Sequence, residues 1–146
     1  MNYQGWEESV PEAIRGDSLW KMEAYRLSLF AGDIGWEDAT KLLQDPRTKF
    51  IADQLYRSLG SVGANIAEGY SRGTRRERAH FYEYALGSTR ESRDWYYKAR
   101  HVLGDAVTTH RLNLLNQILK LLLVTVHNQR GTGIREETTE YSTSSD

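Results

Sequence analysis

The chain has 146 residues, which suits one domain and suffices to bury a hydrophobic core without disulfides or a structural metal. It contains no cysteine, which excludes a disulfide framework, thiol catalysis and cysteine-based zinc or iron–sulfur sites and suits a reducing compartment. The net charge is −1, but it is unevenly distributed along the chain.

Both ends of the chain are acidic and its middle is basic. Residues 1–17 and residues 131–146 each carry one arginine against four carboxylates, while residues 18–130 carry 17 Lys or Arg against 12 Asp or Glu. This pattern favours an acidic partner weakly, and charge placed for solubility explains it as well. The N-terminus lacks the apolar core of a secretory signal, and the apolar stretch 118–126 is too short for a membrane span of about 20 residues. We therefore expect a cytoplasmic protein without membrane contact.

Hydrophobic spacing predicts helices and no strand. The first helix is expected over 18–31, ended by Gly32, and a short helical connector over 35–45, stopped by Asp45 and Pro46. The acidic N-terminal extension 1–17 precedes this helix.

The second helix is expected over 48–70, because apolar residues recur there at spacings of three and four. A row of small residues that includes Gly60 and Gly63 lies beside this stripe. Glycine inside a helix costs about 1 kcal/mol relative to alanine, so the row indicates close approach to a neighbouring helix, unless these are tolerated weak positions.

The third and fourth helices are expected over 74–103 and 108–127. Thr74 and Glu77 have the spacing of a capping box, which places the start of the third helix at Thr74. The fourth helix has an apolar face wide enough for both a core and a partner. With short connections, the helices predict a single-domain, up-down-up-down antiparallel four-helix bundle over 18–130, followed by a disordered polar tail over 131–146.

Catalytic and metal-binding patterns find little support. A di-iron bundle needs two Glu-x-x-His motifs, and the sequence has only Glu77-x-x-His80, where Glu77 is better explained as a cap. The other histidines are scattered, and no phosphate-binding loop or nucleophile motif is present. We expect no cofactor, no metal and no enzymatic activity.

A basic cluster is the remaining candidate site. Its arginines begin in the turn before the third helix and continue along that helix: Arg72, Arg75, Arg76, Arg78, Arg90 and Arg93. Tyrosines are interleaved with them: Tyr70, Tyr82, Tyr84, Tyr96 and Tyr97. Guanidinium groups bind phosphates and exposed tyrosines stack on bases, so the cluster indicates an RNA or DNA surface. The alternative is a solvated helix face with Arg–Glu pairs.

One stretch carries a family resemblance. Residues 61–74 read Ser-Val-Gly-Ala-Asn-Ile-Ala-Glu-Gly-Tyr-Ser-Arg-Gly-Thr, and residues 85–91 read Ala-Leu-Gly-Ser-Thr-Arg-Glu. This pattern resembles the four-helix bundle family of 23S rRNA intervening-sequence proteins, and the likeness extends over about residues 18–126.

The resemblance implies a bacterial protein that assembles as a homopentamer, encoded within rRNA intervening sequences or as a free-standing gene. A related branch resembles the accessory variability determinant of diversity-generating retroelements, which binds nucleic acid and a reverse transcriptase. The sequence therefore leaves three partners open besides further copies of itself: a nucleic acid, a reverse transcriptase, or another protein recruited by the fourth helix and the acidic tail.

Polar residues of the same motif fall on helix faces otherwise lined by small side chains. They are Asn65, Glu68, Ser88 and Glu91. Because buried polar groups must be hydrogen-bonded, we expect a network between the second and third helices, closed by Arg72 or Arg57, that fixes packing rather than performing catalysis.

Overall fold

The computed structural model describes residues 1–131, and every regular element within them is helical. The elements are α1 (Tyr3–Ser9), α2 (Glu12–Arg15), the 3-10 helix η1 (Ser18–Lys21), α3 (Glu23–Leu42), α4 (Lys49–Tyr70), α5 (Arg75–Lys98), α6 (Arg100–Leu103) and α7 (Asp105–Arg130). The predicted all-α class is confirmed for these residues. Of the predicted tail over 131–146, only Gly131 lies within the described residues.

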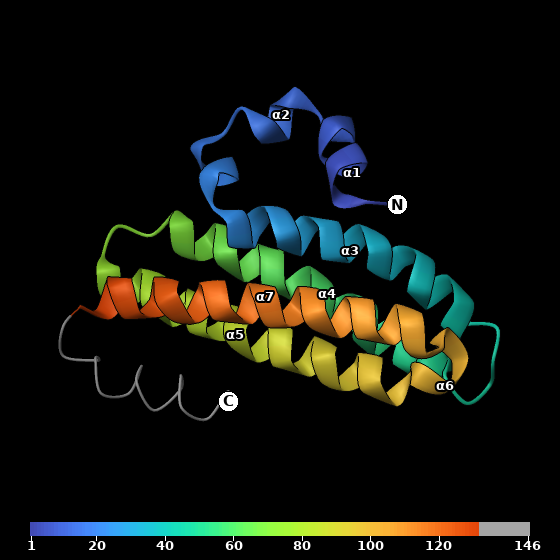
Figure 1. Cartoon of the computed structure of the whole chain (residues 1–146). Helices are drawn as coiled ribbons and strands as arrows, with labels where there is room; N and C mark the ends of the chain where they lie inside the picture. The colour runs from blue at the N-terminus through green and yellow to red at the C-terminus, as the bar shows by residue number, and fades with distance from the viewer. Residues whose placement is uncertain (132–146) are drawn as a thin grey trace.

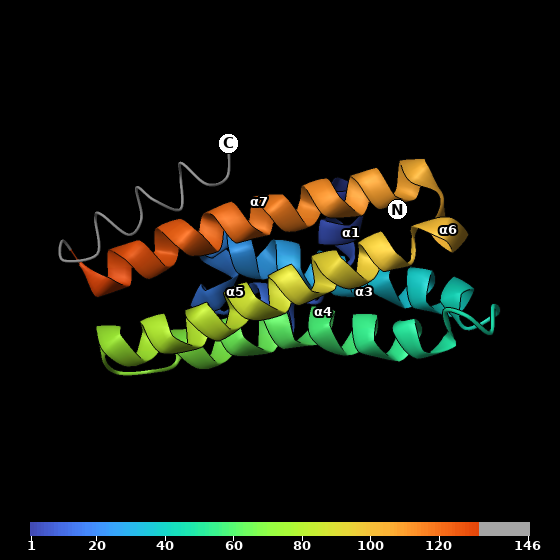
Figure 2. The same ribbon diagram turned by 90° about the horizontal axis from the view of Figure 1, so that it is seen from below.

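The long helices α3, α4, α5 and α7 lie side by side (Figure 1). α5 packs on α4 and α7, and α3 packs on the same two helices. The turn between α4 and α5 lies at the same end of the molecule as the end of α7, and α6 lies at the other end (Figure 2). No helix within residues 1–131 is both long and apolar enough to cross a lipid bilayer.

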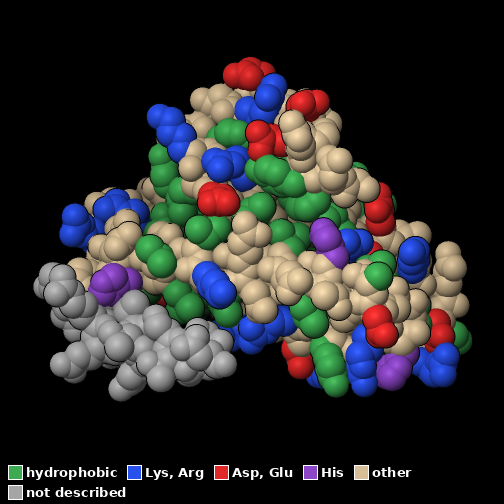
Figure 3. Space-filling view, in the orientation of Figure 1, with side chains coloured by type: hydrophobic (Ala, Val, Ile, Leu, Met, Phe, Trp, Pro, Cys, Tyr) green, Lys and Arg blue, Asp and Glu red, His purple; other side chains and the backbone are tan. Residues whose placement is uncertain are grey.

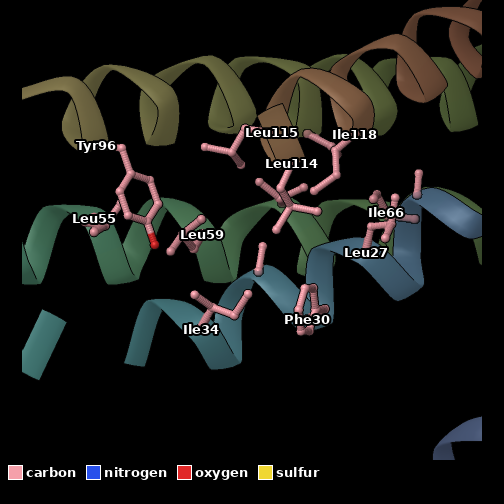
Figure 4. Close-up of a cluster of buried hydrophobic side chains, with 14 of the residues drawn as sticks. Leu27, Phe30, Ile34, Leu55, Leu59, Ile66, Tyr96, Leu114, Leu115 and Ile118 are labelled. Atoms are coloured by element: carbon pink, nitrogen blue, oxygen red, sulfur yellow. The ribbon is translucent and has the colours of Figure 1, made fainter. Parts of the chain in front are cut away.

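The hydrophobic core runs between these four helices. Figure 4 shows a cluster of its side chains, which come from all four helices. Leu55, Ile66, Ile118 and Leu122 are completely buried. Burial of a side chain of this size stabilises the fold by about 1.5–3 kcal/mol, so the core accounts for the packing of the helices. Much of the wide apolar face predicted for the fourth helix is directed into this core.

α3 is one continuous helix, which replaces the predicted helix over 18–31 and the predicted connector over 35–45. The expectation that Gly32 ends a helix is wrong, because this residue lies within α3. Gly35 is also within α3, where a Cβ atom would stand 2.3 Å from Cδ1 of Leu59. The glycine therefore serves the close approach of α3 to α4 and does not break the helix.

The other predicted boundaries are closer to the structure. The helix expected over 48–70 is α4, which begins one residue later. The helix expected over 74–103 is divided at Ala99 into α5 and α6, and the helix expected over 108–127 is longer at both ends, as α7. α7 ends at Arg130, where Gly131 takes a φ of +83° that favours glycine.

The N-terminal segment is part of the folded molecule. Residues 1–17, predicted as an acidic extension outside the bundle, form α1, which packs on α3, and α2, which packs on η1. Trp6 is only 5% exposed, lies against Trp20 and Phe30, and donates a hydrogen bond of 2.6 Å to Asp33. This segment lies at the top of Figure 3, where both acidic and basic side chains are exposed. The buried tryptophan explains the difference, because its contacts lie far along the chain.

The small residues of α4 divide between two environments. A Cβ atom on Gly63 would stand 3.0 Å from Oγ of Ser28 in α3, so this glycine does permit close helix approach. A Cβ atom on Gly60 would meet nothing within 4 Å. The packing explanation is therefore correct for Gly63 and wrong for Gly60 within this chain.

Candidate nucleic-acid interface

The basic turn is fixed by the cap that starts α5. The side chain of Thr74 accepts a hydrogen bond of 3.2 Å from the backbone amide of Glu77, which confirms the predicted N-cap. Because α5 begins at Arg75, both Arg75 and Arg76 lie in its first turn.

Arg75 and Arg76 are exposed, and no carboxylate within residues 1–131 pairs with either of them. The amino end of a helix already carries a partial positive charge, so each cation placed there is unfavourable by about 0.3–1 kcal/mol. Two unpaired arginines at this place concentrate positive potential at one end of the molecule. This arrangement attracts an anion such as a phosphate.

Arg72 and Arg78 are held by contacts within the chain. Arg72 donates a hydrogen bond of 3.0 Å to Glu68, and its guanidinium lies 4.6 Å from the ring centre of Phe81. Arg78 is half-buried and donates hydrogen bonds of 3.0 Å to Gln129 of α7 and 2.9 Å to the carbonyl oxygen of Arg72. Arg78 therefore connects the turn to the end of α7, and Arg72 connects it to α4 and α5.

Arg90 and Arg93 lie further along α5. Arg90 is exposed. Arg93 is half-buried and donates a hydrogen bond of 2.9 Å to Asn116 of α7. The six predicted arginines therefore do not form a single surface.

The interleaved tyrosines are also divided between core and surface. Tyr82 and Tyr96 are buried in the core. Tyr70, Tyr84 and Tyr97 are exposed. Only these three are available to contact another molecule.

The predicted polar network is partly assembled. Asn65 donates a hydrogen bond of 3.0 Å to Oγ of Ser61, which is 2.9 Å from Oγ of Ser88 across the contact between α4 and α5. Ser61 is the connecting residue that the sequence interpretation missed. Its signal was the spacing of four to Asn65, which places both residues on one side of α4.

Glu68 and Glu91 are outside that network. Both are exposed; Glu68 accepts from Arg72, and Glu91 accepts a hydrogen bond of 3.1 Å from the indole of Trp95. Arg57, proposed to close the network, instead lies 3.6 Å from Asp53 on its own helix. This part of the prediction is wrong, because helical position alone did not distinguish the buried flank of each helix from its exposed flank.

A buried ionic cluster was missed altogether. Arg111 of α7 donates hydrogen bonds of 2.7 and 3.1 Å to the carboxylate of Asp38 in α3, which also accepts one of 2.6 Å from the hydroxyl of Tyr96 in α5. Burial raises the pKa of Tyr96 and the neighbouring carboxylate raises it further. Burial alone would lower the pKa of Arg111, but the carboxylate of Asp38 holds it above its usual value. The cluster joins three helices.

The signal for this cluster was Asp38 itself, four residues from Ile34 and four from Leu42 on the buried side of α3. The sequence analysis missed this signal because it placed Asp38 in a short connector rather than in a long helix. The structure also shows no group of three or more His, Asp or Glu within residues 1–131 that could hold a metal ion.

Comparison with known proteins gives the chain a family. A family described as 23S rRNA-intervening sequence protein matches residues 23–123. This chain belongs to that family. The intervening-sequence match begins at the first residue of α3 and therefore excludes α1, α2 and η1.

A solved structure agrees with the fold of this intervening-sequence protein. It is a protein of unknown function from the S23 ribosomal protein family of Bacteroides thetaiotaomicron VPI-5482, with 21% identity and a TM-score of 0.66. The similarity covers 70% of this chain and 97% of that chain. At this identity it supports the fold alone. No curated protein matches the sequence.

Proposed function

We propose that this intervening-sequence protein is a non-catalytic, homo-oligomeric scaffold of the cytoplasm that binds nucleic acid at the basic end of its helices. The observation that supports the proposal most is the pair Arg75 and Arg76, exposed at the start of α5 without a carboxylate partner within residues 1–131. Guanidinium groups in this state can each contact a phosphate without first breaking an ion pair.

We further propose an up-down-up-down antiparallel bundle for α3, α4, α5 and α7, assembled as a homopentamer. The short connections between consecutive long helices support the first part, and the family resemblance supports the second. Light scattering coupled to size-exclusion chromatography tests the assembly. A pentamer has a mass about five times the 16.8 kDa of one chain. A monomer in solution would contradict the scaffold.

Nucleic-acid binding is tested by fluorescence anisotropy with a structured RNA and a DNA duplex at several salt concentrations. We expect an affinity whose logarithm falls linearly with the logarithm of salt concentration, because phosphate contacts release counterions. The double variant Arg75→Glu with Arg76→Glu is expected to abolish binding.

A matched control changes the same charge at the opposite end of α4. Lys41 and Lys49 are exposed beside the connection between α3 and α4, so Lys41→Glu with Lys49→Glu keeps the net charge of the first variant. We expect this control to bind better than the arginine variant. Equal losses in both variants would indicate a general charge effect, and no binding by the unmodified protein would leave recruitment of another protein as the function to test.

A further inference from the structure

We infer that the nucleic acid bound by this protein is single-stranded and that its bases stack on an exposed ridge of α5. The ridge consists of Arg76, His80, Tyr84, Gly87 and Arg90, and is called the α5 ridge below. This inference rests on the nucleic-acid binding proposed above and names the form of its ligand.

The residues of the α5 ridge follow one another at spacings of four, four, three and three, so they share one side of the helix. All five are exposed. At 1.5 Å per residue the ridge extends over about 21 Å. It therefore begins at the basic turn and continues away from it as an open surface, with a cation at each end and aromatic rings between them.

The aromatic rings of the ridge lie close together. The ring centres of His80 and Tyr84 are 4.5 Å apart at an interplanar angle of 64°, and the side chain of Tyr84 is 52% exposed. Phe81 lies beside them, 5.9 Å from Tyr84, and carries the guanidinium of Arg72 over its ring. Arginine and aromatic groups thus alternate from the turn to the ridge, which is the composition of surfaces that bind unpaired bases.

One acidic side chain near the ridge, Glu83, forms an ion pair with Arg130 at the end of α7. This pairing reduces the repulsion that its carboxylate would otherwise exert on a phosphate backbone. Glu91 accepts a hydrogen bond from the neutral indole of Trp95 and keeps its charge, and Glu77 is exposed between Arg76 and Arg78 in the first turn of α5.

Gly87 gives the ridge an open place beside the aromatic rings. A Cβ atom on Gly87 would meet nothing within 4 Å, so packing within this chain does not require glycine there. Glycine inside a helix nevertheless costs about 1 kcal/mol relative to alanine. The missing side chain leaves room for a flat group one turn from Tyr84, where a base can lie.

These observations favour a single strand over a duplex. In a duplex the faces of the bases are covered by neighbouring bases, so aromatic side chains cannot reach them without unstacking. An unpaired base offers its face to a tyrosine, while phosphates on either side reach the flanking arginines. The exposed rings of the α5 ridge can therefore stack on the bases of an unpaired strand but not on those of a duplex.

The experiment compares a labelled single-stranded RNA without self-complementarity with the duplex of the same sequence, by fluorescence anisotropy on the full-length protein at several salt concentrations. The unmodified protein is expected to bind the single strand more tightly. Tyr84→Ala is expected to weaken binding of the single strand roughly tenfold or more, and to weaken binding of the duplex less, because stacking contributes only to the former. Tyr84→Phe retains the ring and is expected to restore the affinity.

Tyr56→Ala is the control. Tyr56 is 42% exposed on α4 and is not one of the tyrosines interleaved with the arginines, so its removal is expected to leave both affinities unchanged. Equal affinity for the single strand and the duplex, with no difference between Tyr84→Ala and Tyr56→Ala, would overturn the inference while leaving the proposed nucleic-acid binding in place. Absence of binding to either ligand would overturn both.

Discussion

Asp38 and Arg111 form the residue-scale interaction that matters most for stability. Their side chains are 3% and 16% exposed, so the pair lies largely in the low-dielectric interior. Removing one member leaves the other charge buried without its partner, and desolvation is then no longer offset.

We expect Asp38→Ala to lower the free energy of unfolding by about 3–5 kcal/mol, because the guanidinium of Arg111 loses its carboxylate. Urea denaturation monitored by circular dichroism measures this loss. The double variant Asp38→Leu with Arg111→Met removes both charges and is expected to recover much of the stability. A single variant as stable as the unmodified protein would show that water reaches Arg111.

Tyr96 links the same cluster to pH. Burial, and then the carboxylate of Asp38, raise its pKa in the folded protein above the unfolded value of about 10. The stability contributed by its neutral hydroxyl is therefore fully present below about pH 10 and is lost progressively as pH rises from there toward the folded pKa, because the unfolded chain ionises first.

We expect the free energy of unfolding to fall less steeply above about pH 10 in Tyr96→Phe than in the unmodified protein. At neutral pH the variant loses one hydrogen bond to Asp38, worth about 1 kcal/mol or more. Urea titrations at neutral and alkaline pH measure both effects. Tyr97→Phe, at an exposed position, serves as the control, and identical slopes in all three proteins would contradict the assignment.

At the scale of the helices, glycine in α4 has two different roles. A Cβ atom on Gly69 would stand 2.8 Å from a ring carbon of Tyr82 and 3.1 Å from the carbonyl oxygen of Arg78 in α5. At Gly60 the corresponding space is open within this chain. Gly69 is therefore required where α4 meets α5, and Gly60 is not.

We expect Gly69→Ala to lower the thermal unfolding temperature, since overpacking costs about 1–3 kcal/mol, and Gly60→Ala to raise it, since alanine favours a helix by about 1 kcal/mol. Thermal denaturation measures the unfolding temperature of both variants, and each serves as the control for the other because the substitution and the helix are the same. A loss of stability in Gly60→Ala would instead indicate that another subunit approaches α4 at this position.

At the scale of the whole molecule, the N-terminal segment is an addition outside the family match at residues 23–123. Trp6 is 5% exposed, and its ring contacts Tyr3, Trp20 and Phe30. None of these three residues belongs to α4 or α5, so the loss of the Trp6 ring is separable from the packing of α4 on α5.

We expect Trp6→Ala to accelerate amide hydrogen exchange in α1 and η1 and to leave the exchange in α4 and α5 unchanged. Hydrogen exchange followed by mass spectrometry resolves these elements. Trp36→Ala removes a tryptophan that is 64% exposed and is the control. Unchanged exchange in α1 would show that other contacts hold the segment.

The local pattern of the sequence was sufficient where a structure depends on near neighbours. The all-α class, the helix over 48–70 and the cap at Thr74 follow from apolar spacing and from a hydrogen bond across three residues. The density of arginines around the turn was also evident, since it is a property of composition along the chain.

Tertiary structure decided what depends on distant partners. The pairing of Asp38 with Arg111 joins residues 73 positions apart, and the burial of Trp6 depends on Phe30 of α3. The sorting of the arginines, with Arg76 exposed and Arg93 turned toward α7, likewise depends on which helices pack against α5. Helical periodicity specifies which residues share a face, whereas only packing specifies which face is covered, because burial is set by the neighbouring helices.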